Sequence, residues 1–208
     1  MDMHEFWGVI EAARLAATAD KPFAQALTDE LGTRTQSGIL GYQERFDEVH
    51  GAVYRWDMWA AAYLIGGGCS DDSFMDFRAG LIALGRDWYG KAATCPDSLA
   101  EHPSVINAAH AQSGQAIFDE DANYAASYAF ERLTGDDHAF YQAWDIYTRP
   151  REKSADGAMT LWEKTSTSRI PQRCSAVSHG SPPSTCATPL TEQKAQNRRT
   201  PRRAAPTP

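Results

Sequence analysis

The sequence lacks the long apolar runs and the leader-like start that direct a chain into or across a membrane. Apolar runs such as Ala60 to Ile65 are far too short to cross a bilayer. The first residues, Met1 to Glu5, are acidic and carry neither a basic stretch nor an apolar core of the secretory type. We therefore expect a cytoplasmic protein with no membrane partner.

Metal-binding and redox motifs are also missing. The cysteines form no Cys-x-x-Cys pair, and none has a histidine at zinc-ligand spacing; they are Cys69, Cys95, Cys174 and Cys186. The six histidines contain no His-Glu-x-x-His motif. Since disulfide frameworks are typical of smaller secreted chains, we expect reduced thiols, and we expect neither a metal nor a cofactor.

No catalytic motif stands out. A Gly-x-Ser-x-Gly nucleophile elbow is absent. Gly66-Gly67-Gly68 lacks the preceding strand and the following Gly-Lys-Ser/Thr of a phosphate-binding loop, and Asp71 and Asp72 after it would repel phosphate. The glycines are better explained as a helix end and a tight turn before a helix capped by Ser70 or Asp71. Whether the protein is an enzyme stays open, with a non-enzymatic role favoured.

Charge is divided unevenly along the chain. The formal net charge is −7, from 20 basic and 27 acidic residues. Residues 1–164 carry 13 Lys and Arg against 26 Asp and Glu, whereas residues 165–208 carry 7 against 1. An acidic body favours solubility or a basic partner and repels nucleic acid, so no nucleic-acid partner is expected.

What the chain does contain is one helical pattern after another. Apolar residues recur at helical spacing, and no segment alternates as a strand does. The helical segments are 3–17, 22–31, 37–50, 54–65, 71–84, 86–93, 116–134 and 137–148, with 97–115 ambiguous. The pattern predicts a single all-α domain of about six to eight helices over 1–150, followed by a disordered, basic Pro/Ser/Thr-rich tail over 151–208.

The segment 54–65 is apolar nearly all round, which is typical of a buried helix. We expect it to form a helical hairpin with 71–84 at the centre of the domain. Trp56 and Phe77 should be among the most buried side chains.

Two charged residues fall within the apolar stripes of this predicted hairpin. Asp57 and Arg78 lie at similar distances from the glycine turn, which places them at the same height on antiparallel helices. Because an isolated buried charge is costly, we expect a buried Asp57–Arg78 salt bridge. Its role is either structural or that of the floor of a ligand site.

Two blocks of the sequence resemble a known family. The first is YRWDMWAAAY, from Tyr54 to Tyr63, and the second is GGCSDDSF, from Gly67 to Phe74. In these blocks the chain is similar to the bacterial domain-of-unknown-function family 4240, and the resemblance covers about residues 3–150. It implies a small helical module with no assigned activity and transfers no catalytic residue.

The resemblance makes residues 54–86 the region to search for a site. The candidate binding residues in it are Arg55, Asp57, Trp59, Ser70, Asp71, Asp72, Arg78 and Arg86. The favoured function is a non-enzymatic intracellular interaction or regulatory module whose acidic surface binds a protein partner, for instance a basic one. The alternative is a small phosphate-ester hydrolase with Asp57, Asp71, Asp72 and Arg78 around a cleft, with Arg78 as an anion clamp.

The C-terminal tail departs from the family. Residues 165–208 hold seven prolines and no aromatic residue, whereas the family resemblance implies an acidic stretch and then an apolar helix. We hypothesise a frameshift near Leu161-Trp162, because a shifted frame over 163–189 can encode such an ending. The domain would then expose an apolar patch where its closing helix docks. Sequencing the gene tests this: the absence of an open shifted frame with that ending would refute it.

Overall fold

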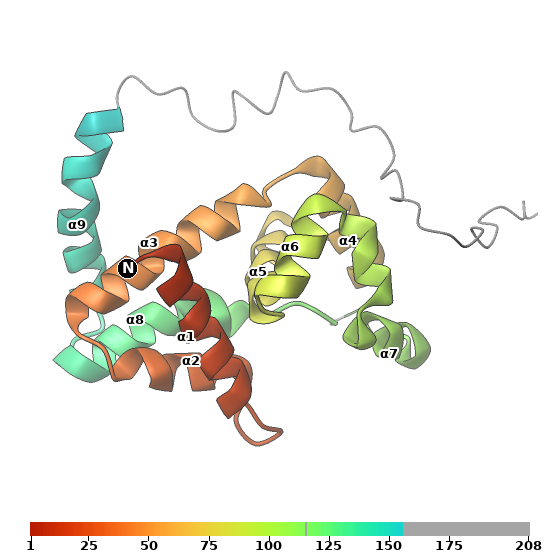
Figure 1. Ribbon diagram of the computed structural model, residues 1–208, viewed down its shortest axis with the longest axis horizontal. Helices are drawn as coiled ribbons and strands as arrows, with labels where there is room; N and C mark the ends of the chain where they lie inside the picture. Colours follow the sequence, from red (N-terminus) through yellow and green to blue (C-terminus); the bar gives the residue numbers. More distant parts are fainter. Residues whose placement is uncertain (115, 156–208) are drawn as a thin grey trace, which may run out of the picture. The chain divides into compact units, whose positions relative to one another are not determined.

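The computed structural model describes residues 1–114 and 116–155, and over these residues the fold is all-α, as predicted (Figure 1). The described part holds nine α-helices and one 3-10 helix. They are α1 (Met3–Ala16), α2 (Phe23–Gly32), α3 (Gln36–Ala52), α4 (Trp56–Gly66), α5 (Asp71–Ala83), α6 (Arg86–Thr94), η1 (Pro96–Glu101), α7 (Pro103–Ala111), α8 (Glu120–Thr134) and α9 (Ala139–Ala155).

The predicted and observed helices differ mainly at two places. The ambiguous stretch 97–115 contains most of η1 and all of α7, which raises the number of helices above the six to eight expected. Helix α9 also runs through Pro150 to Ala155, beyond the predicted end at residue 148. The predicted tail beyond Ala155 lies outside the described residues.

The core forms around α8, which packs against α2, α3, α5 and α9. Its inward face is a stripe of alanines at helical spacing, all buried: Ala122, Ala125, Ala126 and Ala129. Small side chains let neighbouring helices approach closely, and large side chains from those helices then fill the space. The largest fully buried ones include Phe6, Leu27, Tyr42, Phe77 and Phe130.

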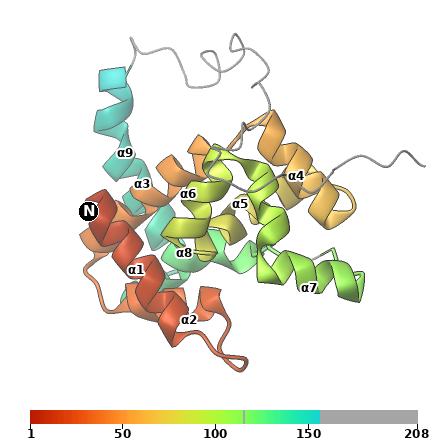
Figure 2. The ribbon, with the colours of Figure 1, turned by 45° about the vertical axis from the view of Figure 1, so that its right-hand side comes forward.

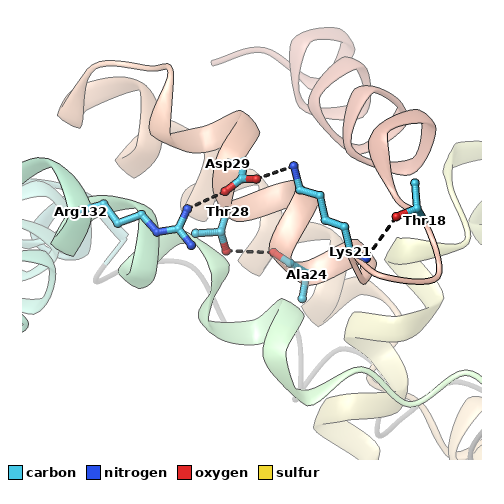
Figure 3. A network of polar contacts seen from close by, with 6 residues as sticks. All are labelled: Thr18, Lys21, Ala24, Thr28, Asp29 and Arg132. Carbon is cyan, nitrogen blue, oxygen red and sulfur yellow. Dashed lines mark hydrogen bonds and ion pairs between the residues drawn. The ribbon is translucent and has the colours of Figure 1, made fainter.

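A surface network ties α2 to the end of α8 (Figure 3). The Asp29 carboxylate of α2 accepts a hydrogen bond from Arg132 Nη1 at 2.6 Å and pairs with the Lys21 ammonium. These two cations, Lys21 foremost, lower the pKa of Asp29. Because all three side chains are partly exposed to solvent, the network adds little stability and mainly fixes the position of the loop before α2.

Helix α4 is not the buried central helix that its composition predicts. Only Met58 and Ala62 are buried, whereas Trp56 is 79% exposed and Leu64 is 80% exposed. The expectation is right for Phe77 of α5, which is fully buried, and wrong for Trp56. Figures 1 and 2 both show α4 and α7 on the side of the helices away from α9.

The cysteines differ from one another. Cys69 is a free thiol, but Cys95 is disulfide-bonded, so the expectation of reduced cysteines is wrong at Cys95. Cys174 and Cys186 lie outside the described residues. Among the helices of the described ranges, none combines the length and the apolar character needed to cross a membrane.

Candidate functional site

The glycine turn between α4 and α5 has the structural role that the sequence indicates. Gly67 ends α4 with a left-handed φ of 68°, which favours glycine, and the Gly68 N–H donates to the Tyr63 carbonyl at 3.0 Å. Ser70 then caps α5, accepting from the Ser73 N–H at 3.2 Å. Asp71 and Asp72 both lie in the exposed first turn of α5, where their negative charge complements the helix dipole.

Arg55 and Asp57 form a two-pronged ion pair at the start of α4. Arg55 Nε and Nη2 donate to the two Asp57 carboxylate oxygens at 3.0 and 3.1 Å, and Nη1 donates to the Ala93 carbonyl at 2.9 Å. The two side chains are 32% and 35% exposed, respectively. The pair therefore attaches the start of α4 to the end of α6, with its charges partly in solvent.

The predicted Asp57–Arg78 salt bridge is wrong. Arg78 Nη1 donates to the carbonyl oxygen and to Nδ1 of His50, both at 3.0 Å, and Nε donates to the Phe74 carbonyl at 3.3 Å. Met58 marks the inward face of α4, so Asp57 lies beside that face and meets its near neighbour Arg55 instead. Arg78 faces the last turn of α3, where helix carbonyls carry partial negative charge.

Aromatic rings complete the surroundings of Arg78. Its guanidinium lies 4.8 Å from the centroid of the Tyr54 ring and 5.0 Å from that of Phe74, both suitable for cation–π attraction. The Trp59 ring packs on Phe74 with centroids 4.6 Å apart. Burial lowers the pKa of Arg78, but an arginine remains charged in this setting. Trp59 and Arg78 thus belong to one cluster, joined through Phe74.

The hydrogen bonds of His50 fix its protonation state. Nε2 lies 3.0 Å from the Met75 carbonyl oxygen and must donate, whereas Nδ1 faces the Arg78 N–H and must accept. The ring is therefore neutral. Burial, together with the charge of Arg78, lowers the pKa of His50 to about 4.

Arg86 belongs to neither group. Its backbone N–H donates to Glu11 Oε1 of α1 at 3.2 Å, and its side chain is exposed. The eight candidates therefore fall into separate places: the Arg55–Asp57 pair, the Trp59 and Arg78 cluster, the first turn of α5, and the start of α6. In the described ranges, no three His, Cys, Asp or Glu side chains are placed to hold a metal ion.

A groove of about 490 Å³ that the sequence did not predict lies between α4, η1 and α7. Its walls are mostly small or apolar: Ala61, Leu64, Ile65, Pro96, Leu99, Ala100, Val105, Ala108 and Ala109. At one end the chain after α7 passes directly against α4, since a Cβ on Gly114 would lie 2.6 Å from the Gly66 carbonyl oxygen. A larger residue at Gly114 would push the two walls apart.

The wall formed by α7 is held only loosely. Helix α7 has no buried residue, and its main contact is with η1. The sequence did not predict α7 because the apolar residues of 97–115 show only weak helical periodicity. The one available signal for the groove is the missing polar face of α4, but by itself an apolar helix indicates burial as readily as an exposed binding surface.

The comparisons with known proteins give a family and no activity. The model of the family described as "Protein of unknown function (DUF4240)" matches residues 1–132. No curated protein and no solved structure matches the chain.

Proposed function

We propose that this chain, which belongs to the DUF4240 family, is a non-enzymatic module that binds a protein partner through the outward side of α4. The observation that carries the proposal is the exposed apolar surface of that helix. Trp56 is 79%, Tyr63 56% and Leu64 80% exposed, on a helix whose only charged residue, Asp57, is already paired with Arg55.

The spacing of these residues suits a protein contact. Trp56, Ala60, Tyr63 and Leu64 follow the i, i+4, i+7, i+8 pattern that places side chains on one helix face, and all four are exposed. Exposed single apolar residues are ordinary, but a continuous face with tryptophan and tyrosine is typical of an interface. The acidic charge of the body would speed the approach of a basic partner.

The hydrolase alternative lacks a comparable observation. Asp57 is engaged by Arg55, and the Nη1 and Nε groups of Arg78 are engaged by His50 and the Phe74 carbonyl. Neither Arg78 nor the aspartates of α5 line the groove. We therefore advance the binding module alone.

Site-specific photo-crosslinking in the native host tests the proposal. A benzophenone amino acid replaces Tyr63 of α4 in one strain and Leu15, which is 87% exposed on α1, in a matched control. We expect one discrete adduct from position 63 and none from position 15. Tyr63→Glu should weaken binding of the identified partner by roughly tenfold, and Leu15→Glu should not. Equal adducts at both positions, or none at position 63, would contradict the proposal.

A further inference from the structure

The groove between α4 and α7 has walls of the kind that accommodate a helix. Helix α4, which forms one wall, has 11 residues and is therefore about 16 Å long. Alanines occur in both walls, Ala61 in α4 and Ala108 and Ala109 in α7, and their small side chains leave room for a helix backbone to approach closely. Leu64, in the wall formed by α4, is 80% exposed and is available to a docked helix.

Among the described residues that line this groove, the only charged one is Asp97. The segments that supply its walls, 56–67 and 92–114, contain no Lys or Arg, and their acidic residues are Asp97, Glu101 and Asp57, which is paired with Arg55. Asp97 lines the groove, and Glu101 lies four residues further along η1. Both are exposed, and within the described residues neither forms an ion pair.

We infer that this groove binds a basic amphipathic helix, with an apolar stripe against α4 and α7 and Lys or Arg facing η1. The inference rests on the proposed function and specifies the partner's chemistry. Hydrophobic burial in the groove supplies affinity, and the unpaired carboxylates of Asp97 and Glu101 select for positive charge.

Two other occupants fit the groove less well. A second copy of the chain would bring the same acidic rim against itself, which like-charge repulsion opposes. The chain's own residues 165–208 are basic, but they contain seven prolines and no aromatic residue, so they lack an apolar helical stripe.

A designed peptide tests the inference on the full chain. The peptide is a fluorescein-labelled helix of about 18 residues with leucines at i, i+3, i+4 and i+7 and Lys or Arg elsewhere. Its control has the same leucines with Glu in place of every Lys and Arg. Fluorescence anisotropy should show binding of the basic peptide that weakens with added salt, and at least roughly tenfold weaker binding of the acidic one. Equal affinity for the two peptides would overturn the inference.

Matched variants locate the binding surface. Leu64→Glu and Ala109→Glu, at exposed groove positions, should each weaken binding of the basic peptide by roughly tenfold. Leu15→Glu on α1 should leave its affinity unchanged. Asp97→Lys combined with Glu101→Lys should remove most of the salt dependence, and Asp20→Lys, in the loop before α2, should not. Circular dichroism verifies that each variant is folded. Equal losses from Leu15→Glu and Leu64→Glu would refute binding in the groove.

The remaining outcomes separate the competing occupants. If analytical ultracentrifugation shows a dimer that Leu64→Glu converts to a monomer, the groove binds a second copy of the chain and the inference is wrong. Peptide binding that appears only after Arg198, Arg199, Arg202 and Arg203 are changed to Glu would assign the groove to the chain's own C-terminal residues. If crosslinking at position 63 captures a partner but the basic peptide does not bind, the proposed function stands and the inference fails.

Discussion

Helix α8 is more polar than helix α4, yet α8 is the more deeply buried of the two. Helix α8 carries exposed charges such as Glu131 and Arg132, yet its alanine stripe lies at the centre of the core. Helix α4 is apolar on nearly every side, yet it buries only Met58 and Ala62. The comparison shows that the arrangement of neighbouring helices decides burial, because a helix with two apolar faces can bury one and expose the other.

The difference between core and edge should be largest in amide hydrogen exchange. We expect α8 amides to exchange through global unfolding, at about 5–15 kcal/mol, because α8 contacts most of the core. Amides of α7 should exchange through local opening with a free energy below about 2 kcal/mol, since this helix has no buried residue. Exchange measured by NMR or mass spectrometry tests this. Equal protection of α7 and α8 would remove the distinction between the two regions.

A pair of matched truncations should give the next largest effect. Leu27→Ala removes a fully buried side chain from α2 and should lower the free energy of unfolding by about 2–5 kcal/mol. Leu64→Ala, on the exposed side of α4, should change it by less than about 0.5 kcal/mol. Denaturant titration compares the two. A large loss from Leu64→Ala would mean that α4 supports the core more than its exposure indicates.

The neutral His50 of α3, which is hydrogen-bonded to Met75 and Arg78 of α5, should make stability depend on pH. The pKa of His50 is lowered to about 4 in the fold, against about 6.5 in an unfolded chain, so the unfolded state binds the proton first. The stability that neutral His50 contributes to the fold is fully present above about pH 6.5 and is lost as the pH falls toward about 4. The loss should be about 2–3 kcal/mol, allowing for partial exposure of the ring.

Urea unfolding from about pH 7 to about pH 4 measures this effect, with His50→Gln as the non-titrating control. The variant should show a shallower decline than the natural chain over this range. If the two profiles are parallel, another group carries the pH dependence.

The smallest effect concerns the ion pair of α4. Asp57→Ala should cost no more than about 1 kcal/mol, because its partner Arg55 stays partly solvated. A loss of about 3 kcal/mol or more would instead indicate a buried charge left without its partner. In double-mutant cycles, Asp57 should couple to Arg55 by about 0.5 kcal/mol and be additive with Arg78. Coupling of Asp57 to Arg78, without coupling to Arg55, would instead support the predicted Asp57–Arg78 salt bridge.

The sequence predicted local features well because their causes are local. The helical periodicities, the Gly67 helix end and the Ser70 cap depend on residues within one or two turns. It misplaced the partners of Asp57 and Arg78 because pairing across helices depends on how each helix is rotated. Periodicity alone leaves that rotation open on a helix that is apolar all round.

The sequence by itself determined an all-α fold, the approximate limits of most helices and the buried position of Phe77, because apolar spacing and capping act along the chain. Only the tertiary structure decided that α4 lies at the edge, that Arg78 meets His50, and that α4, η1 and α7 enclose a groove. These features depend on contacts between segments up to about 50 residues apart, where packing of whole helices, rather than local propensity, sets the geometry.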